Sequence, residues 1–185
     1  MVIKEYPNLL TKEECERIIE YAKQSNIVPA EVVGPNDDGY RTADYCWIDE
    51  NHDVILSWVK DFVSKETNSP ILNQEGLHIV RYGIGGKYDE HHDWFDTDDD
   101  EHIDQIGNSG NRTHSFLIYL NDEFVDGETK FIHQDKIIKP EIGKGLMWTN
   151  MVNGNILDES LHAGLPVTDG YKWILIIWVR ENTFE

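Results

Sequence analysis

The stretch YKWILIIWVR, residues 171–180, decides the fold class of this chain. Its centre, residues 173–179, is the longest apolar run of the sequence and is rich in β-branched and aromatic residues, which is typical of a buried strand. The run is far shorter than the roughly 18 apolar residues that a membrane-spanning helix needs. Similar short runs recur upstream between turn residues such as Asp126-Gly127. They occupy residues 77–82, 115–120, 129–132 and 145–149, so the second half of the chain is predicted to consist of strands.

The first 70 residues carry a helical pattern instead. Thr11 and Glu14 form a Thr-x-x-Glu capping box, and apolar residues then follow at helical spacing as far as Ala22. A wide apolar stripe over residues 54–63 predicts a second helix. Between the two helices lies a loop rich in Gly, Pro and Asp, residues 34–39. Two helices followed by many short strands predict a β-barrel or sandwich with helices packed on it.

Charge and composition exclude several classes of function. The chain has 185 residues, with 16 lysines and arginines against 35 aspartates and glutamates, so its net charge is −19. Such an acidic chain is poorly suited to neutralise phosphates, which argues against a nucleic acid or an anionic membrane as partner. The N-terminus has no apolar signal core, so a cytoplasmic location is expected, with Cys15 and Cys46 as reduced core thiols. The length predicts one domain, residues 1–185, of unknown oligomeric state.

One short motif has the composition of a metal site. In His91-His92-Asp93, a strand would place His91 and Asp93 on one face and His92 on the other. His162 lies far downstream, and a hairpin through the turn at residues 169–170 would bring it to the same end of a barrel as Lys172. Two histidines and one carboxylate with open positions serve non-haem Fe(II) and O₂ chemistry, and the same donors also suit catalytic zinc. The remaining histidines are interpreted as surface or hydrogen-bonded residues: His52, His78, His102, His114 and His133.

Six ordered motifs, spread over almost the whole chain, resemble those of the 2-oxoglutarate- and Fe(II)-dependent dioxygenases. Within that group they resemble the prolyl 4-hydroxylases, including the short single-domain microbial and viral forms. The motifs lie in residues 8–15, 41–43, 82–93, 119–129, 162–167 and 172–180. The resemblance implies a mainly β fold, a double-stranded β-helix of the jelly-roll or cupin type. Its core would be residues 77–181, and residues 1–70 would supply helical support and a substrate loop.

The resemblance also implies roles for individual residues. His91, Asp93 and His162 would hold Fe(II), and Lys172 would bind the distal carboxylate of 2-oxoglutarate, a task that suits a compact point charge. Three further positions match contacts to this co-substrate: Tyr82, Tyr119 and Thr129. Four match positions near the substrate: Arg41, Tyr88, Trp178 and Arg180.

The implied activity is hydroxylation of peptidyl proline with O₂, with release of succinate and CO₂ and with ascorbate as a reductant. The presence of Asp93 points to hydroxylation, since related halogenases lack that carboxylate. Three positions depart from the family pattern, namely Ala43 in place of Ser, Glu90 in place of Pro, and Asp126 in place of the first of two glycines. None of them is a proposed ligand.

Two other functions stay open at this point. The first is the same chemistry on a free amino acid, another peptidyl side chain or a small metabolite. The second is a non-catalytic, cupin-like binding domain. A loop over residues 33–49 that closes on an extended peptide would favour a peptide substrate, whereas a small sealed pocket would favour a metabolite.

The excess of acid is concentrated beside the metal motif. Residues 89–104 hold nine of the 35 acidic residues and no lysine or arginine. Apart from Asp93, this stretch is predicted to form a loop near the mouth of the barrel. One interpretation is a solvated acidic loop, and the other is a field that attracts a basic peptide.

Overall fold

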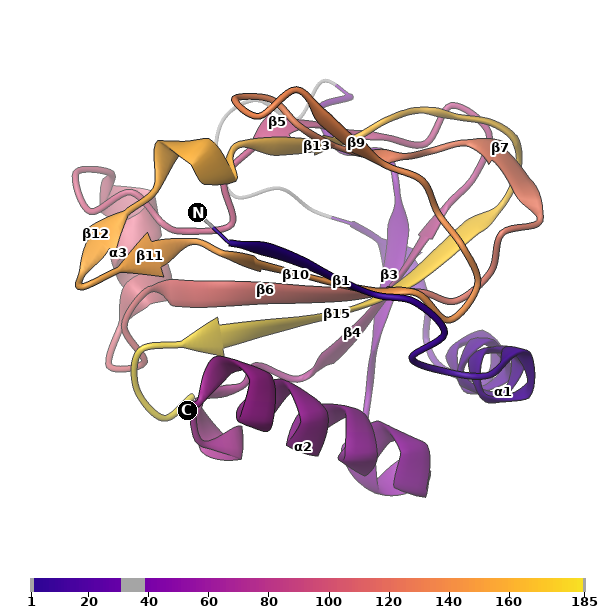
Figure 1. Cartoon of the computed structure of the whole chain (residues 1–185), viewed down its shortest axis with the longest axis horizontal. Coiled ribbons are helices and arrows are strands. Elements are labelled where there is room, and N and C mark those ends of the chain that lie inside the picture. The colour runs from indigo at the N-terminus through magenta and orange to yellow at the C-terminus, as the bar shows by residue number, and fades with distance from the viewer. Residues whose placement is uncertain (1, 31–38, 185) are drawn as a thin grey trace.

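Two antiparallel sheets face each other in the computed structural model, which describes residues 2–30 and 39–184 (Figure 1). The large sheet contains, in spatial order, β1 (Ile3–Tyr6), β10 (Gly145–Thr149), β6 (Arg112–Tyr119), β15 (Lys172–Arg180), β4 (Leu77–Tyr82), β3 (Asp44–Ile48) and β2 (Val28–Pro29). The small sheet contains β5 (Tyr88–His91), β13 (His162–Gly164), β8 (Thr129–Phe131) and β9 (Lys136–Ile138). Two further pairs join β14 (Val167–Gly170) to β7 (Phe124–Asp126), and β11 (Met151–Val152) to β12 (Asn155–Ile156).

Two helices, α1 (Lys12–Gln24) and α2 (Val54–Thr67), cover the outer face of the large sheet (Figure 1). The capping box starts α1 as predicted, because the Thr11 hydroxyl accepts from the Glu14 amide and the Glu14 carboxylate accepts from the Thr11 amide. Asp53 caps α2 and is also ion-paired with Arg17 of α1, so one carboxylate joins the two helices. Short 3₁₀ turns lie at residues 50–52, 71–73 and 158–160.

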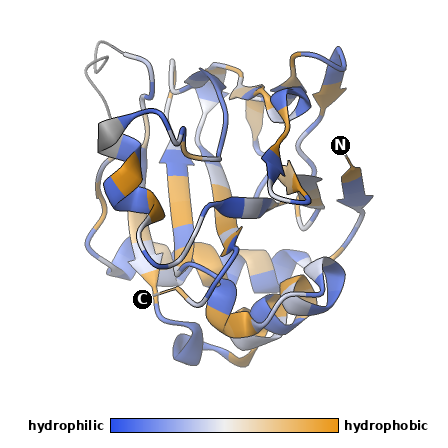
Figure 2. Ribbon diagram, turned by 90° about the vertical axis from the view of Figure 1, so that its left-hand side faces the viewer, coloured by the Kyte–Doolittle hydropathy of each residue, from blue (hydrophilic) through white to orange (hydrophobic). Residues whose placement is uncertain are grey.

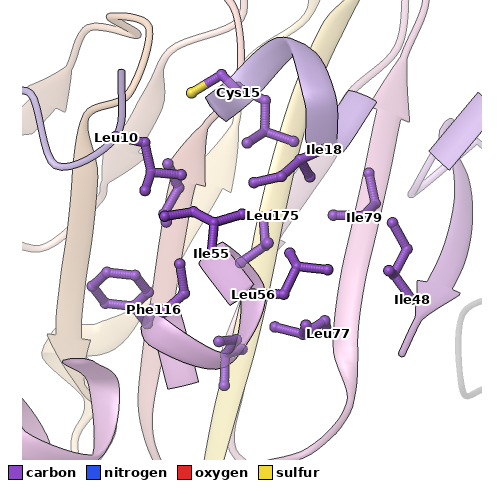
Figure 3. Packing of buried hydrophobic residues seen from close by; sticks show 14 of the residues in the cluster. Leu10, Cys15, Ile18, Ile48, Ile55, Leu56, Leu77, Ile79, Phe116 and Leu175 are labelled. Carbon is purple, nitrogen blue, oxygen red and sulfur yellow. The ribbon is translucent and has the colours of Figure 1, made fainter. Parts of the chain in front are cut away.

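The strand β15 is buried along its whole length because both of its faces are covered. Leu175 and Ile177 point to the helices, where they pack with residues such as Leu56 and Ile18 (Figure 3). Their neighbours along the strand belong to a second apolar cluster, between the two sheets, which includes Phe131 of the small sheet. The sequence of a strand buried on both faces is a continuous apolar run. Figure 2 shows the hydrophobic colour along the central strands.

The structure confirms the predicted fold class, a mainly β jelly-roll core with helices at the N-terminal side. Two strands, β4 and β10, have the bounds that the sequence pattern gave. The second helix continues four residues beyond the predicted end, because its last turn is polar and adds nothing to an apolar stripe. Both cysteines are free and buried. Among the described residues, no helix has the length and apolar character needed to cross a bilayer.

Two predictions about local structure are wrong. The acidic stretch after the metal motif is not all loop, since it contains the helix α3 (Asp100–Ile106). Residues 169–170 do not form a hairpin turn toward β15, because they lie within β14 and pair with β7. The proposed substrate loop falls partly outside the described residues, since residues 33–38 are among those that the structure leaves out.

Candidate metal centre and adjoining cleft

Three side chains converge where β5 and β13 pair. His162 lies directly opposite His91 in the antiparallel ladder, and Asp93 follows β5 by two residues. The Nε2 atoms of His91 and His162 lie 3.7 and 3.8 Å from the two carboxylate oxygens of Asp93. One ligand atom from each residue lies within 4.8 Å of the other two, so the group could hold one metal ion. The sequence argument placed His91 and Asp93 on one strand. That detail is wrong, because β5 ends at His91.

Backbone carbonyls orient both imidazoles. The Nδ1 atom of His91 lies 2.7 Å from the carbonyl oxygen of Asp89, and that of His162 lies 2.9 Å from the carbonyl oxygen of Ser160. A carbonyl only accepts, so each Nδ1–H donates, and Nε2 is the nitrogen of each ring that lies toward Asp93. Burial holds the pKa of His91 well below its ordinary value. This imidazole is therefore neutral at physiological pH, as a metal ligand must be.

Asp93 is buried and is kept ionised by its neighbours. Burial by itself would raise the pKa of Asp93, but nearby positive charge, that of the Arg112 guanidinium included, and a hydrogen bond from Ser115 together hold the pKa below its ordinary value. The Ser115 hydroxyl donates to Oδ2 of Asp93 at 2.5 Å, and the Asn150 amide donates to the Ser115 oxygen at 2.9 Å. Ser115 and Asn150 are fully buried. These two hydrogen bonds hold the Asp93 carboxylate in place through Oδ2, so Oδ1 does not take part in the contact with Ser115.

A buried ion pair connects the metal centre to the large sheet. The Arg112 guanidinium donates to both carboxylate oxygens of Glu75, at 2.7 and 2.8 Å, and to the carbonyl oxygen of Asp93 at 3.4 Å. Its central carbon lies 3.9 Å from the centre of the Trp178 ring. Arg180 approaches the same carboxylate, with Nε 3.5 Å from Glu75. Sequence reasoning missed this pair, since nothing in the chain marks Glu75 and Arg112 as neighbours.

Lys172 points into a small cavity that the three converging residues also line. The residue is only 2% exposed, and burial lowers the pKa of its ammonium group to about 8. Its Nζ donates to the carbonyl oxygen of Gly127 at 2.7 Å, and no described carboxylate forms an ion pair with it. A buried ammonium group without a carboxylate partner is suited to bind an anion. The predicted hairpin route is wrong here too, since His162 and Lys172 stand on the two facing sheets.

The three other predicted co-substrate residues surround this lysine. The ring centres of Tyr82 and Tyr119 lie 5.1 and 5.7 Å from its Nζ. The Tyr119 hydroxyl donates to Thr129 at 2.7 Å. Asp126, where the family pattern has glycine, adopts a left-handed conformation with φ 63°, which Asp tolerates better than most residues. The turn that presents the Gly127 carbonyl to Lys172 therefore forms despite the departure.

A larger cleft of about 1080 Å³ opens beside the metal centre. All four predicted substrate residues line it, with the Arg41 guanidinium 4.8 Å above the Tyr88 ring and Tyr88 stacked on His91 at 3.4 Å between ring centres. Acidic residues line it as well: Glu90, Asp96 and Asp104, besides Glu75 and Asp93. Glu90, Asp96 and Asp104 are also exposed, so part of the acidic stretch lines the cleft and contacts solvent as well.

The histidines outside the triad confirm the ordinary interpretation with one exception. His92 is not part of the candidate metal group and contacts Ser160 and Trp94. His78 contradicts the interpretation, because it is 4% exposed and neither ring nitrogen has a hydrogen-bond partner.

Comparison with known proteins agrees with this geometry. A family model described as the 2OG-Fe(II) oxygenase superfamily matches residues 77–180. A protein of Acanthamoeba polyphaga mimivirus named "Putative prolyl 4-hydroxylase" is 33% identical over 180 residues, which cover 96% of this chain and 74% of that protein. Prolyl 4-hydroxylase 5 of Arabidopsis thaliana is 30% identical over 206 residues, 97% of this chain and 68% of the relative. The viral collagen prolyl hydroxylase of Paramecium bursaria Chlorella virus-1, solved as a 2OG complex, aligns with a TM-score of 0.79 at 24% identity and covers 97% and 96% of the two chains.

The hydrogen bonds behind Asp93 lead to a prediction about metal affinity. Replacing Ser115 with Ala removes the donor that fixes the carboxylate, and losses of this kind weaken metal binding by about 10- to 100-fold. Asn150→Ala acts one hydrogen bond further away and should have a smaller effect. Anaerobic Fe(II) or Co(II) titration measures both, with the exposed Ser57→Ala as control. Unchanged metal affinity in Ser115→Ala would show that the hydroxyl does not position Asp93.

Proposed function

The chain belongs to the 2OG-Fe(II) oxygenase superfamily, and from that premise we propose that it hydroxylates prolyl residues of a peptide. As a dioxygenase of this superfamily, it uses Fe(II), 2-oxoglutarate and O₂. The observation that carries the proposal is that the buried triad, the unpaired Lys172 and the aromatic cleft adjoin one another. The relatives named as prolyl 4-hydroxylases support proline as the target.

The donor set of the triad fits iron. We assign His91, Asp93 and His162 as its ligands, because two imidazole nitrogens and one carboxylate on one side leave the remaining positions open. Bound there with 2-oxoglutarate, Fe(II) supplies the oxidation of a C–H bond by O₂, with succinate and CO₂ as the other products. Ser115 and the two backbone carbonyls hold the ligands in place.

Lys172 is the proposed partner of the distal carboxylate of 2-oxoglutarate. Its charge lies on the large sheet, across the small cavity from the triad, and lacks an anionic partner. Thr129 and Tyr82 line the same cavity, and Tyr119 acts through its hydrogen bond to Thr129. These residues would orient the co-substrate and neutralise its charge, while the surrounding apolar residues exclude water.

The substrate side is formed by aromatic rings and guanidinium groups. Tyr88 and Trp178 give apolar walls of fixed shape beside the triad, which suit a prolyl ring. Arg41 and Arg180 line the same cleft and offer donors to peptide carbonyl groups. The volume of about 1080 Å³ exceeds what a free amino acid needs and supports a peptide substrate. The need for ascorbate and a cytoplasmic location stay predictions.

A succinate-release assay over a peptide panel tests the proposed function. Peptides that contain proline should stimulate conversion of 2-oxoglutarate to succinate and should gain one oxygen atom by mass spectrometry. Matched peptides with alanine in place of proline, and the variant His162→Ala, are the controls. Stimulation by a free amino acid alone would contradict the prolyl assignment. Absence of any succinate would contradict catalysis itself.

Lys172 gives the binding of 2-oxoglutarate a pH dependence. Its pKa is lowered to about 8, so its charge is lost as pH rises through this value, and affinity should then fall by up to about tenfold per pH unit. Lys172→Arg should bind with little change over the same range, because a guanidinium stays charged. Lys172→Ala should lower the affinity for 2-oxoglutarate by about 10- to 100-fold and leave metal binding intact.

Anaerobic equilibrium titration with metal-loaded protein measures these affinities. If the wild type and Lys172→Arg show the same pH dependence, another group titrates. Loss of metal in Lys172→Ala would contradict the separate roles of lysine and triad.

The acidic lining of the cleft supports a basic peptide as the preferred substrate. If Glu90 and Asp104 attract cationic residues, kcat/KM for a lysine-flanked proline peptide should fall with added salt more steeply than for a neutral peptide. The double variant Glu90→Gln, Asp104→Asn should reduce this difference, whereas the exposed Asp169→Asn should not. Equal salt dependence for both peptides would contradict the proposed preference for a basic peptide.

A further inference from the structure

Buried polar atoms without a partner are concentrated around the larger cleft. Among the described residues, ten buried side-chain nitrogen and oxygen atoms lack a hydrogen bond, and seven of them belong to residues that line this cleft. They are Arg41 Nε, His78 Nδ1 and Nε2, Trp94 Nε1, Trp178 Nε1, and Arg180 Nε and Nη1. Of these, Arg180 Nε still lies 3.5 Å from the Glu75 carboxylate, in an ion pair. A buried polar group without a hydrogen bond is unfavourable, so such a concentration favours a surface that a bound ligand completes.

His78 differs chemically from the rest of this set. The arginine and tryptophan nitrogens are all donors, which suit the carbonyl oxygens of a peptide. Burial, together with the charges of Arg41 and Arg112, lowers the pKa of His78 to about 3, so its imidazole is neutral and has one donor and one acceptor nitrogen. Within this set, His78 is therefore the one residue that can accept a hydrogen bond.

The position of His78 is fixed by register between strands. In the pairing of β3 with β4, Trp47 lies opposite His78, and the two rings stack at 4.5 Å between centres with an angle of 20°. Trp178 lies 5.3 Å from the same imidazole. Gly76 permits the close approach of Trp47, because a Cβ at this position would lie 3.1 Å from the indole. Trp47 itself is half exposed, so it lies between His78 and the solvent side of this wall, where a bound peptide would have to move it to reach the imidazole.

We propose that His78 is a specificity residue whose unprotonated ring nitrogen accepts a hydrogen bond from a main-chain N–H of the bound peptide. This inference rests on the proposed function. Proline has no N–H, so the donor must come from a residue that flanks the target proline. His78 would thereby select peptides in which proline has an N–H-bearing neighbour over runs of consecutive prolines.

The proposal predicts opposite effects on stability and on substrate recognition. Phe keeps the ring and its stacking on Trp47, and it removes two unpaired nitrogens from the core. His78→Phe should therefore melt at the same temperature as the wild type or higher. It should nevertheless discriminate less between peptides that have an N–H beside the target proline and peptides that lack it. A purely structural histidine would give a lower melting temperature instead.

The experiment compares kcat/KM for a proline peptide with analogues in which one flanking amide at a time is replaced by an ester. Each replacement removes one N–H and keeps the carbonyl. The wild type, loaded with Fe(II) and 2-oxoglutarate, should lose about three- to tenfold at one ester position, the effect of one hydrogen bond. His78→Phe should show no such loss there, and His78→Gln, which keeps an acceptor, should restore it. His114→Phe, outside the cleft, is the matched control and should behave as the wild type.

The inference is overturned if His78→Phe and the wild type respond alike to every ester. It is also overturned if His78→Phe lowers the melting temperature and leaves the amide preference intact. If the wild type hydroxylates no peptide but oxidises another substrate, the proposed function fails and this inference falls with it. If the wild type hydroxylates peptides and only the ester effect is missing, the inference alone fails.

Discussion

His91 and His162 face each other across the antiparallel pair of β5 and β13, and the other features of the site depend on this pairing. It brings residues 71 positions apart in the sequence (162 − 91) within reach of one carboxylate. Asp93 is buried, so its charge is stable only with partners, which Ser115 and Arg112 supply within the protein. The imidazoles expose Nε2 toward it because backbone carbonyls hold Nδ1, and Ser115 donates to its second oxygen.

The two sheets contribute different parts of the chemistry. The small sheet carries the histidines, while the large sheet carries Lys172 and Trp178 on one strand, β15. The helices cover the outer face of that sheet and the small sheet covers the inner face, so β15 is buried on both sides. Lys172, the proposed cation for the co-substrate, and Trp178, the proposed aromatic wall for the substrate, thus lie on one strand, and both line the small cavity with the triad.

Sequence patterns predicted what depends on local periodicity. The bounds of β4 and β10 followed from apolar runs, and the start of α1 followed from its capping box. The helix α3 was missed because a stretch of acidic residues has no apolar stripe to reveal it. For the site, the ligand triad and Lys172 were predicted from motif spacing and family resemblance, and the structure places all four residues around one cavity.

The layer behind these residues was not predictable in the same way. Ser115 and Arg112 lie on β6, whereas Asn150 directly follows β10 and Glu75 precedes β4. The pairing of β6, β10, β15 and β4 brings these segments near Asp93. His78 was interpreted as an ordinary surface or hydrogen-bonded histidine. It is buried without a hydrogen bond because Trp47 stacks on it from the neighbouring strand, which the sequence does not reveal. A polar residue in a strand pattern does not reveal which neighbours it will have.

The most direct test of this account is a crystal structure of the protein with Mn(II), a redox-inert substitute for Fe(II), and 2-oxoglutarate. The account predicts one anomalous peak bound by Nε2 of His91, Nε2 of His162 and a carboxylate oxygen of Asp93. It also predicts that the distal carboxylate of 2-oxoglutarate contacts Nζ of Lys172. Metal bound at other residues, or a co-substrate carboxylate directed away from Lys172, would contradict it.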